Sequence, residues 1–264
     1  MTKRESILND ARLLAVAVSA SLLFGCVSAQ LTHLDPSFTP TALNDGALAI
    51  GGVAVTNTAE AVSDRQNDSI IDYFEREVLD RRPEVALIKH KVVQTALGEQ
   101  VSKQLALVGA VEEEIAPERL AALVSKGARY VVFVAVTYNT VDRYVTNNTD
   151  ARNVYDADGK VTGRTVKYVT IAQAKRSVTA EYRIFDVTTG KRVWTSNSSN
   201  ARSRSRIANS REGYPPAPEY GATPTVSRVM RPMTTAVVKE LPAQEKATPA
   251  EILPNVTTED RADG

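Results

Sequence analysis

The run RYVVFVAV at residues 129–136 is the most strand-like stretch of the chain, because it consists almost entirely of β-branched and aromatic residues. The strand pattern continues, in a more polar form, to about Val145. A turn signal, Asp-Ala-Asp-Gly, follows at residues 156–159, and residues 162–187 then read as extended almost throughout. The sequence therefore predicts a long antiparallel hairpin with its turn near Asp158.

This hairpin pairs the start of one strand with the end of the other. We expect one apolar face to contain Val131, Phe133 and Ala135 together with Ala180, Tyr182 and Ile184. A slip of one residue would invert this arrangement. Strands of about 25 residues would span about 80 Å, which is far longer than usual. Either the strands break, or residues 138–176 form an arm that projects from the domain.

Shorter elements flank the hairpin on both sides. Upstream, apolar patterns predict strands at 48–55 (LAIGGVAV) and 85–88 and helices at 68–82, 90–108 and 117–127. Downstream, they predict a turn at 188–190, a strand at 191–204, a proline-rich loop at 213–225 and a helix at 226–241. These elements define one domain over residues 48–241.

Residues 1–25 have the features of a secretory signal peptide. Three basic residues precede an uncharged, mostly apolar run at 13–24, and a helix of this length covers about 18 Å, too little for a bilayer core of about 30 Å. Leu-Phe-Gly-Cys at 23–26 looks like a bacterial lipobox, in which the cysteine becomes the lipidated first residue. The alternative is a buried structural cysteine beside an ordinary signal peptide. We expect Cys26 to be lipidated.

The residues next to this cysteine suggest a location. Val27 stands where an Asp is associated with retention in the inner membrane, so we expect the outer membrane, with the domain facing the periplasm. Residues 26–47 show no periodicity and read as a lipidated tether. The last residues, 242–264, are rich in proline, threonine and charge and read as a disordered tail.

Composition excludes several function classes. Lysine and arginine number 32 against 31 aspartate and glutamate, so no net positive charge drives nucleic-acid binding. One cysteine allows neither an intrachain disulfide nor a Cys-rich zinc site. The spacings H-E-x-x-H, G-x-S-x-G and the P-loop are absent from the sequence. We expect no catalysis, no cofactor and no metal.

Several single features favour structural explanations. Gly51-Gly52 lies inside an apolar strand, where close backbone packing explains it better than phosphate binding. His90 is expected to be solvated, and the glutamates at 112–114 to be a solvated charge run. Phe185 and Trp194 are expected in the core.

Three arginines, Arg202, Arg204 and Arg206, alternate along the last predicted strand and so share one face. One hypothesis is a contact with an anion or a protein partner, such as lipid headgroups or an acidic glycan. The alternative, which we favour, is protection of a sheet edge against aggregation.

The order of these elements resembles the CsgG/LpoB-like periplasmic lipoproteins, whose domain is similar to the TolB N-terminal domain. The most specific stretch is residues 182–196, with its Phe-Asp strand end, Thr-Thr-Gly-Lys turn and Val-Trp strand. The resemblance implies an α/β fold with a mixed sheet and packed helices. It implies a non-catalytic role in binding a membrane, through the lipid, and an envelope protein. Only Cys26 is carried over as a functional residue.

Two functions follow as expectations. The first is an outer-membrane lipoprotein with a binding domain that assists an envelope assembly or peptidoglycan-related machine. The alternative is a subunit of an oligomeric CsgG-like secretion channel, against which the polar faces of the predicted hairpin argue.

Overall fold

The computed structural model describes residues 27–56 and 58–243. The expected signal peptide at 1–25, the lipidated Cys26 and nearly all of the expected tail at 242–264 lie outside these residues. Among the described residues, no helix is both long enough and apolar enough to span a membrane.

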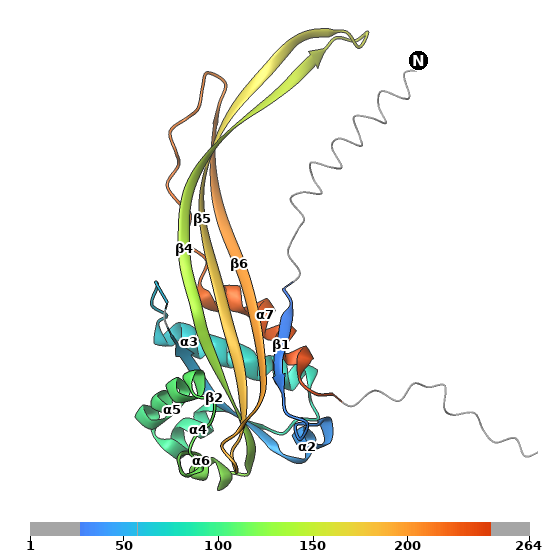
Figure 1. The fold of residues 1–264 in the computed structure, drawn as a ribbon. Coiled ribbons are helices and arrows are strands. Elements are labelled where there is room, and N and C mark those ends of the chain that lie inside the picture. Colours follow the sequence, from blue (N-terminus) through green and yellow to red (C-terminus); the bar gives the residue numbers. More distant parts are fainter. Residues whose placement is uncertain (1–26, 57, 244–264) are drawn as a thin grey trace, which may run out of the picture.

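A six-stranded sheet forms the centre of the domain (Figure 1). Its spatial order is β1-β6-β5-β4-β2-β3; β2, β3 and β4 run parallel, and the other pairings are antiparallel. The strands are β1 (Ala29–Leu34), β2 (Ala47–Val55), β3 (Leu87–Ile88), β4 (Ala128–Tyr155), β5 (Val161–Asp186) and β6 (Arg192–Ser210).

Helices cover both faces of the lower half of the sheet. They are α2 (Pro40–Asp45), α3 (Asp64–Arg81), α4 (His90–Leu97), α5 (Glu99–Val111), α6 (Pro117–Val124) and α7 (Val226–Glu240). The apolar sides of α3 and α7 form one core with the sheet, and those of α4, α5 and α6 form a second core on the opposite face. The predicted α/β fold with a mixed sheet and packed helices is confirmed. Gly98, at φ 82°, divides the helix that we expected over 90–108 into α4 and α5.

The apolar run at 130–136 lies in β4 and is buried on both faces. Val132, Val134 and Val136 join the α3/α7 core, whereas Val131, Phe133 and Ala135 join the opposite core. Val134 pairs with Tyr182 and Phe133 with Arg183, so the expected register is wrong by one residue. The cause is physical: a strand with apolar residues at every position carries no alternation that distinguishes its faces.

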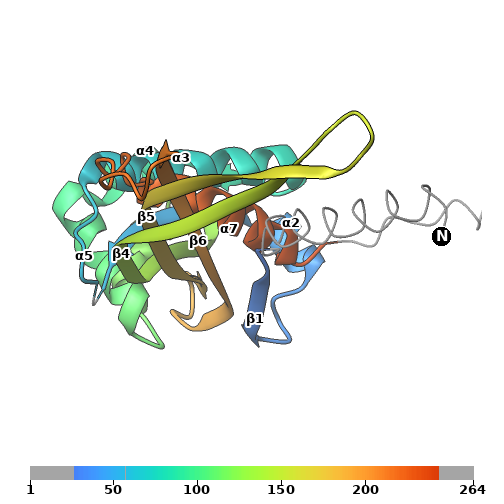
Figure 2. The same cartoon turned by 90° about the horizontal axis from the view of Figure 1, so that it is seen from above.

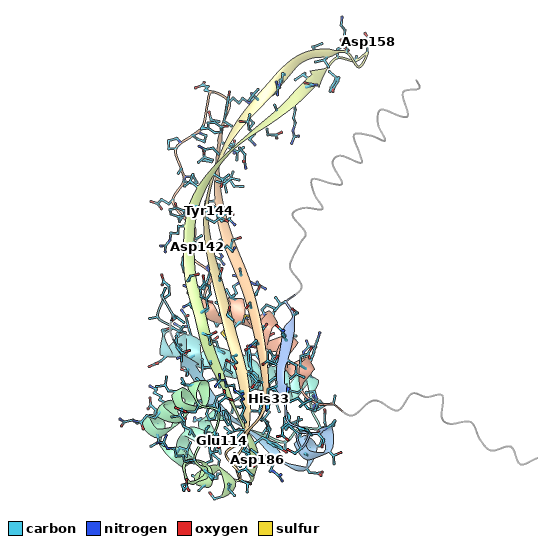
Figure 3. All side chains as sticks on the ribbon, viewed as in Figure 1. His33, Glu114, Asp142, Tyr144, Asp158 and Asp186 are labelled. Atoms are coloured by element: carbon cyan, nitrogen blue, oxygen red, sulfur yellow. The ribbon has the colours of Figure 1, made fainter. Side chains whose placement is uncertain are left out.

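The long hairpin projects from the body as the expected arm, residues 138–176 (Figure 1). Strand β6 accompanies it as far as the pair Tyr168–Ser210, and beyond that point the hairpin has two strands. Figure 3 places Tyr144 along the arm and Asp158 at its tip. Seen from above, the tip bends away to one side of the sheet (Figure 2).

A proline-rich strap, residues 211–225, returns along the arm toward α7. Thr170 Oγ1 donates a hydrogen bond to the carbonyl oxygen of Pro215 at 2.8 Å. The rings of Tyr168 and Tyr214 meet edge to face with centroids 5.1 Å apart. Ala172 and Ala174 are fully buried on this side. The arm therefore has one face partly covered by the strap, the inner face, and one outer face.

The described part of the expected tether at 26–47 contains a strand and a helix. Residues 29–34 form β1, which pairs antiparallel with β6 from Ala29–Ser198 to Leu34–Trp194. Residues 40–45 form α2, capped by the Thr39 hydroxyl and with Leu43 fully buried. The tether prediction is wrong here because an edge strand with mixed polarity shows no apolar period.

The glycine pair in β2 packs closely, as the sequence predicted. A Cβ atom at Gly51 would lie 2.1 Å from the ring of Phe133, and one at Gly109 in α5 would lie 2.3 Å from the same ring. The register of β2 against β4 shifts between Ile50 and Gly52, a β-bulge in which Gly52 takes φ 131°. Gly51 and Gly109 therefore make room for the Phe133 ring.

Candidate functional site: a basic groove between β6 and α7

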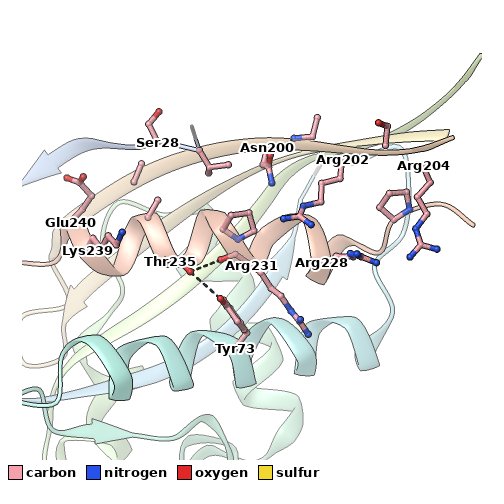
Figure 4. A pocket seen from close by; sticks show the side chains of 17 residues that line it. Ser28, Tyr73, Asn200, Arg202, Arg204, Arg228, Arg231, Thr235, Lys239 and Glu240 are labelled. Atoms are coloured by element: carbon pink, nitrogen blue, oxygen red, sulfur yellow. Dashed lines mark hydrogen bonds between the residues drawn. The ribbon is translucent and has the colours of Figure 1, made fainter. Parts of the chain in front are cut away.

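A groove of about 1110 Å³ lies between β6 and α7 (Figure 4). Its walls come from four parts of the chain. Residues 27–29 and the stretch 200–204 of β6 line one side, and α7 with Tyr73 of α3 lines the other. The Asn200 side chain donates a hydrogen bond of 2.8 Å to the Val229 carbonyl and so fixes β6 on α7 at this point. We call this site the basic groove.

The lining of the basic groove is strongly positive. It contains five basic side chains and one acidic side chain, although the whole chain has a net charge of only +1. The basic residues are Arg202, Arg204, Arg228, Arg231 and Lys239, and the acidic residue is Glu240. Clustered positive charge in a concave surface raises the local concentration of anions.

The structure places two of the three predicted arginines in this groove. Arg202 and Arg204 reach from β6 toward α7 (Figure 4). Arg206 lies farther along the same face, beside the strap, where its Cγ atom is 3.8 Å from the position of a Cβ atom on Gly221. The last pair of β1 with β6 is Ala29–Ser198, so these arginines also lie on a part of β6 whose outer edge is open among the described residues.

Sequence reasoning missed the contribution of α7. Arg228 and Arg231 are three residues apart in the helix and therefore share a face, opposite the apolar stripe of Val229, Met233 and Val237. This spacing is visible in the sequence. What is not visible is that the face lies beside Arg202, because that depends on where α7 packs on the sheet.

Tyr73 lies on α3 and contacts α7 at the groove. Its hydroxyl lies 3.2 Å from Thr235 Oγ1, and the Arg231 guanidinium lies 5.4 Å from the centre of its ring, a cation–π distance. Nearby, burial pushes the pKa of Glu77 up, but hydrogen bonds from Arg81, Thr235 and Tyr73 outweigh it and hold the pKa below its ordinary value. Glu77 is therefore a carboxylate that binds α3 to α7.

A second polar cluster fixes the base of the arm. Asn139 is fully buried in β4; its amide nitrogen donates to the Glu60 carbonyl at 2.9 Å, and its amide oxygen accepts from Arg176. Arg176 also donates from Nε to the carbonyl of Pro224 at 2.6 Å. Burial lowers the pKa of Arg176. The cluster joins both strands of the arm to the end of the strap.

The two histidines are separate and serve the fold. His33 Nε2 lies 3.2 Å from the Arg192 carbonyl. His90 is half-buried, with Nδ1 3.0 Å from the Ile50 carbonyl and its backbone N–H donating to Glu75 at 2.7 Å. The expectation of a solvated His90 is therefore wrong, because the residue closes the junction between β2 and α4.

A smaller cavity of about 280 Å³ lies beside His90 and Gly52. Its rim includes Lys103, whose Nζ lies 3.0 Å from Glu99 and 3.7 Å from Asp64. The hydrogen bond with Glu99 raises the pKa of Lys103. Within residues 27–56 and 58–243, no group of three or more His, Cys, Asp or Glu side chains could hold a metal ion.

The remaining residues named from the sequence have the burial that was expected of them. Phe185 and Trp194 are buried in the two separate cores, as expected. The glutamates at 112–114 are exposed, and Glu113 pairs with Arg192.

The chain matches no protein-family model and no curated protein. It is similar to solved structures at low identity. Lipoprotein GNA1162 from Neisseria meningitidis is 13% identical over 60% of this chain and 83% of the other, with a TM-score of 0.37. The PelC dodecamer from Paraburkholderia phytofirmans is 13% identical over 83% and 99%, with a TM-score of 0.34. The LpoB C-terminal domain from Salmonella enterica is 12% identical over 62% and 96%, with a TM-score of 0.30.

At these identities and TM-scores the likeness defines no shared function. The connection to the CsgG/LpoB-like lipoproteins therefore stays a resemblance.

Proposed function

We propose that this protein is an outer-membrane lipoprotein, held by acyl chains on Cys26, whose non-catalytic periplasmic domain binds a protein of an envelope assembly or peptidoglycan-related machine. The lipobox at 23–26 supports the anchor. The observation that carries the binding role is the arm, because the structure leaves its outer face without cover from any described element.

The outer face of the arm offers a surface suited to a protein contact. Tyr138, Tyr144 and Ile207 are 47%, 41% and 61% exposed, although they lie on regular strands. Ile207 pairs across the sheet with Ile171. Exposed aromatic and aliphatic side chains gathered among polar ones are typical of interaction surfaces.

The arm also has two open edges. Among the described residues, the edge of β4 that pairs with β2 has no partner beyond the bond from Thr56 to Val136. In the same part of the chain, the edge of β6 that pairs with β1 has no partner beyond Ser198. Open edges present unpaired N–H and C=O groups, to which an extended segment of a partner can add as a further strand. The same arm can therefore bind through its face or its edges.

The second candidate function is a secretion-channel subunit. The short distance between the proposed anchor and the base of the long arm is the observation that favours it. Ala29 is three positions after Cys26, a reach of about 10 Å, and it pairs beside the base of the arm. The arm extends beyond this level by the twenty residues from Val161 to Ala180, or about 65 Å. An arm of this length that points toward the membrane would lie along it or enter it. The exposed polar residues of both arm strands support the first arrangement.

The binding role is tested by photo-crosslinking in living cells. A crosslinking residue replaces Tyr144 or Ile207 on the outer face, and the matched control replaces Val111, which is 62% exposed on α5. We expect one discrete heterologous product from the arm positions and none from Val111. A ladder of self-crosslinked multiples would favour the channel. Products equal to the control would contradict a binding role for the arm.

A shortened arm gives the second test. Replacing residues 148–169 by Asn-Gly keeps the pair Asn147–Thr170 and leaves both cores intact. We expect this variant to fold and to keep the crosslinked product from Tyr144, because Tyr138, Tyr144 and Ile207 all lie outside the deleted segment. Loss of the product would contradict the contact at these residues and move it to the removed residues 148–169.

A further inference from the structure

The basic groove opens beside the first residues of the domain. Val27, Ser28 and Ala29 line it, and Val27 directly follows Cys26. An extended chain covers at most about 3.6 Å per residue, so a lipid on Cys26 would lie within about 10 Å of Ala29. The lipid anchor and the groove therefore belong to the same side of the molecule.

The positive charge of the groove is available to a ligand. Within the described part of the chain, Arg202, Arg204 and Arg228 form no ion pair with a carboxylate, and all three are exposed. The guanidinium group has a planar set of donors that fits two oxygens of a phosphate at once. Three such groups on facing elements can surround one or two phosphates.

The size and lining of the groove indicate more than a bare ion. A volume of about 1110 Å³ far exceeds the needs of one phosphate, and Ala29, Pro232 and Ala236 add apolar surface. Basic residues near a membrane surface each gain about 1 kcal/mol from anionic lipids. A lipid headgroup places its phosphate next to glycerol and methylene groups, which this mixture of surfaces accommodates.

We propose that the basic groove binds the phosphate of an anionic glycerophospholipid in the membrane that anchors Cys26. This inference rests on the proposed lipid anchor. Bound in this way, the headgroup forms a second contact with the membrane and holds the β6–α7 side of the domain against it. The anchor alone would leave the domain free to rotate.

Native mass spectrometry of the full chain, purified from membranes in a nonionic detergent, tests this site. The probes are phosphatidylglycerol, phosphatidylcholine and inorganic phosphate at equal concentration. The variant carries R202Q, R204Q and R228Q, and the control carries K91Q, R119Q and K126Q, which remove equal charge at exposed positions on the other side. Circular dichroism establishes that both variants are folded.

We expect the parent and the control to retain phosphatidylglycerol in preference to phosphatidylcholine. Loss of three arginines should weaken this retention about 100-fold, at about 1 kcal/mol for each charge. Equal retention of the two lipids, or equal retention by the folded groove variant and the control, would overturn the proposal. Retention of inorganic phosphate that displaces the lipid would also overturn it, in favour of a free-phosphate site.

A segment of this chain that could occupy the basic groove in place of a lipid is tested in the same way. Residues 244–264 contain five acidic and two basic residues and follow α7, whose Glu240 lines the groove. Retention of phosphatidylglycerol only after removal of this segment would make it the occupant and overturn the proposal. The intact mass of each sample reports separately whether Cys26 is acylated, so failure of the anchor is distinguished from failure of the groove.

Discussion

The Nε atom of Arg176 donates a hydrogen bond of 2.6 Å to the carbonyl oxygen of Pro224 and thereby joins the arm to the end of the strap. The same guanidinium bonds the buried Asn139 of the neighbouring strand. One side chain therefore joins both strands of the arm to the strap at the base of the arm. The binding role proposed for the arm depends on this junction.

Replacing Arg176 should loosen the junction. We expect Arg176→Met to cost about 1–3 kcal/mol, because Asn139 loses a partner while it remains buried. Hydrogen exchange should quicken in the strap and at the base of the arm. The matched control is Lys175→Met, the next residue on the opposite face of β5, and equal exchange in both variants would contradict the role of Arg176.

Close packing around Phe133 gives a second prediction. Alanine in place of glycine within a helix normally stabilises it by about 1 kcal/mol, but at Gly109 the new Cβ would lie 2.3 Å from the Phe133 ring. We expect Gly109→Ala to destabilise the protein by about 1–3 kcal/mol, measured by urea unfolding. Gly163→Ala, in open space on the arm, is the control. A stabilised Gly109→Ala variant would show that the ring moves freely.

The carboxylate of Glu77 predicts a pH dependence. Its pKa in the folded protein lies below the ordinary value of 4.5. Its contribution to stability is therefore complete above pH 4.5 and is lost as the pH falls through the lower, folded pKa. We expect Glu77→Gln to cost about 1 kcal/mol at pH 7, a figure reduced by the exposure of Arg81.

Thermal unfolding across pH checks this expectation. The difference between parent and Glu77→Gln should shrink as the pH falls below 4.5, whereas Glu219→Gln, in the exposed strap, should match the parent throughout. A constant difference down to the lowest pH would show that Glu77 acts through packing and not through its charge.

The outer face of the arm should contribute to binding and not to folding. We expect the double variant Tyr144→Lys and Ile207→Lys to keep the unfolding free energy within about 0.5 kcal/mol, because both side chains are largely exposed. The same variant should lose the crosslinked product obtained from Tyr138. A product of unchanged yield would remove this face from the proposed contact.

The sequence predicted the arm because its turn signal and two long extended patterns are local features. It did not predict the register, because residues 131–136 are apolar at every position and the strand is buried on both faces. The strand β1 was missed for the opposite reason: AQLTHL lies at a sheet edge and has no alternation of burial for a pattern to reveal.

The sequence predicted the part of the candidate site that lies on β6 but not the part that lies on α7. Arg202 and Arg204 could be placed on one face from their spacing alone, since side chains alternate along a strand. Arg228 and Arg231 lie on a helix more than twenty residues later in the chain, and only tertiary packing brings them to the same groove. Sequence periodicity describes faces of single elements and says nothing about which faces meet.

The most direct measurement is the mass of the full chain, purified from membranes, by light scattering with and without detergent. The proposed accessory role predicts a monomer, or a small multiple of it, whose protein mass lies below the 28.6 kDa of all 264 residues because residues 1–25 are removed. A discrete ring of many copies would contradict this account. It would make the arm a candidate channel lining despite its polar faces.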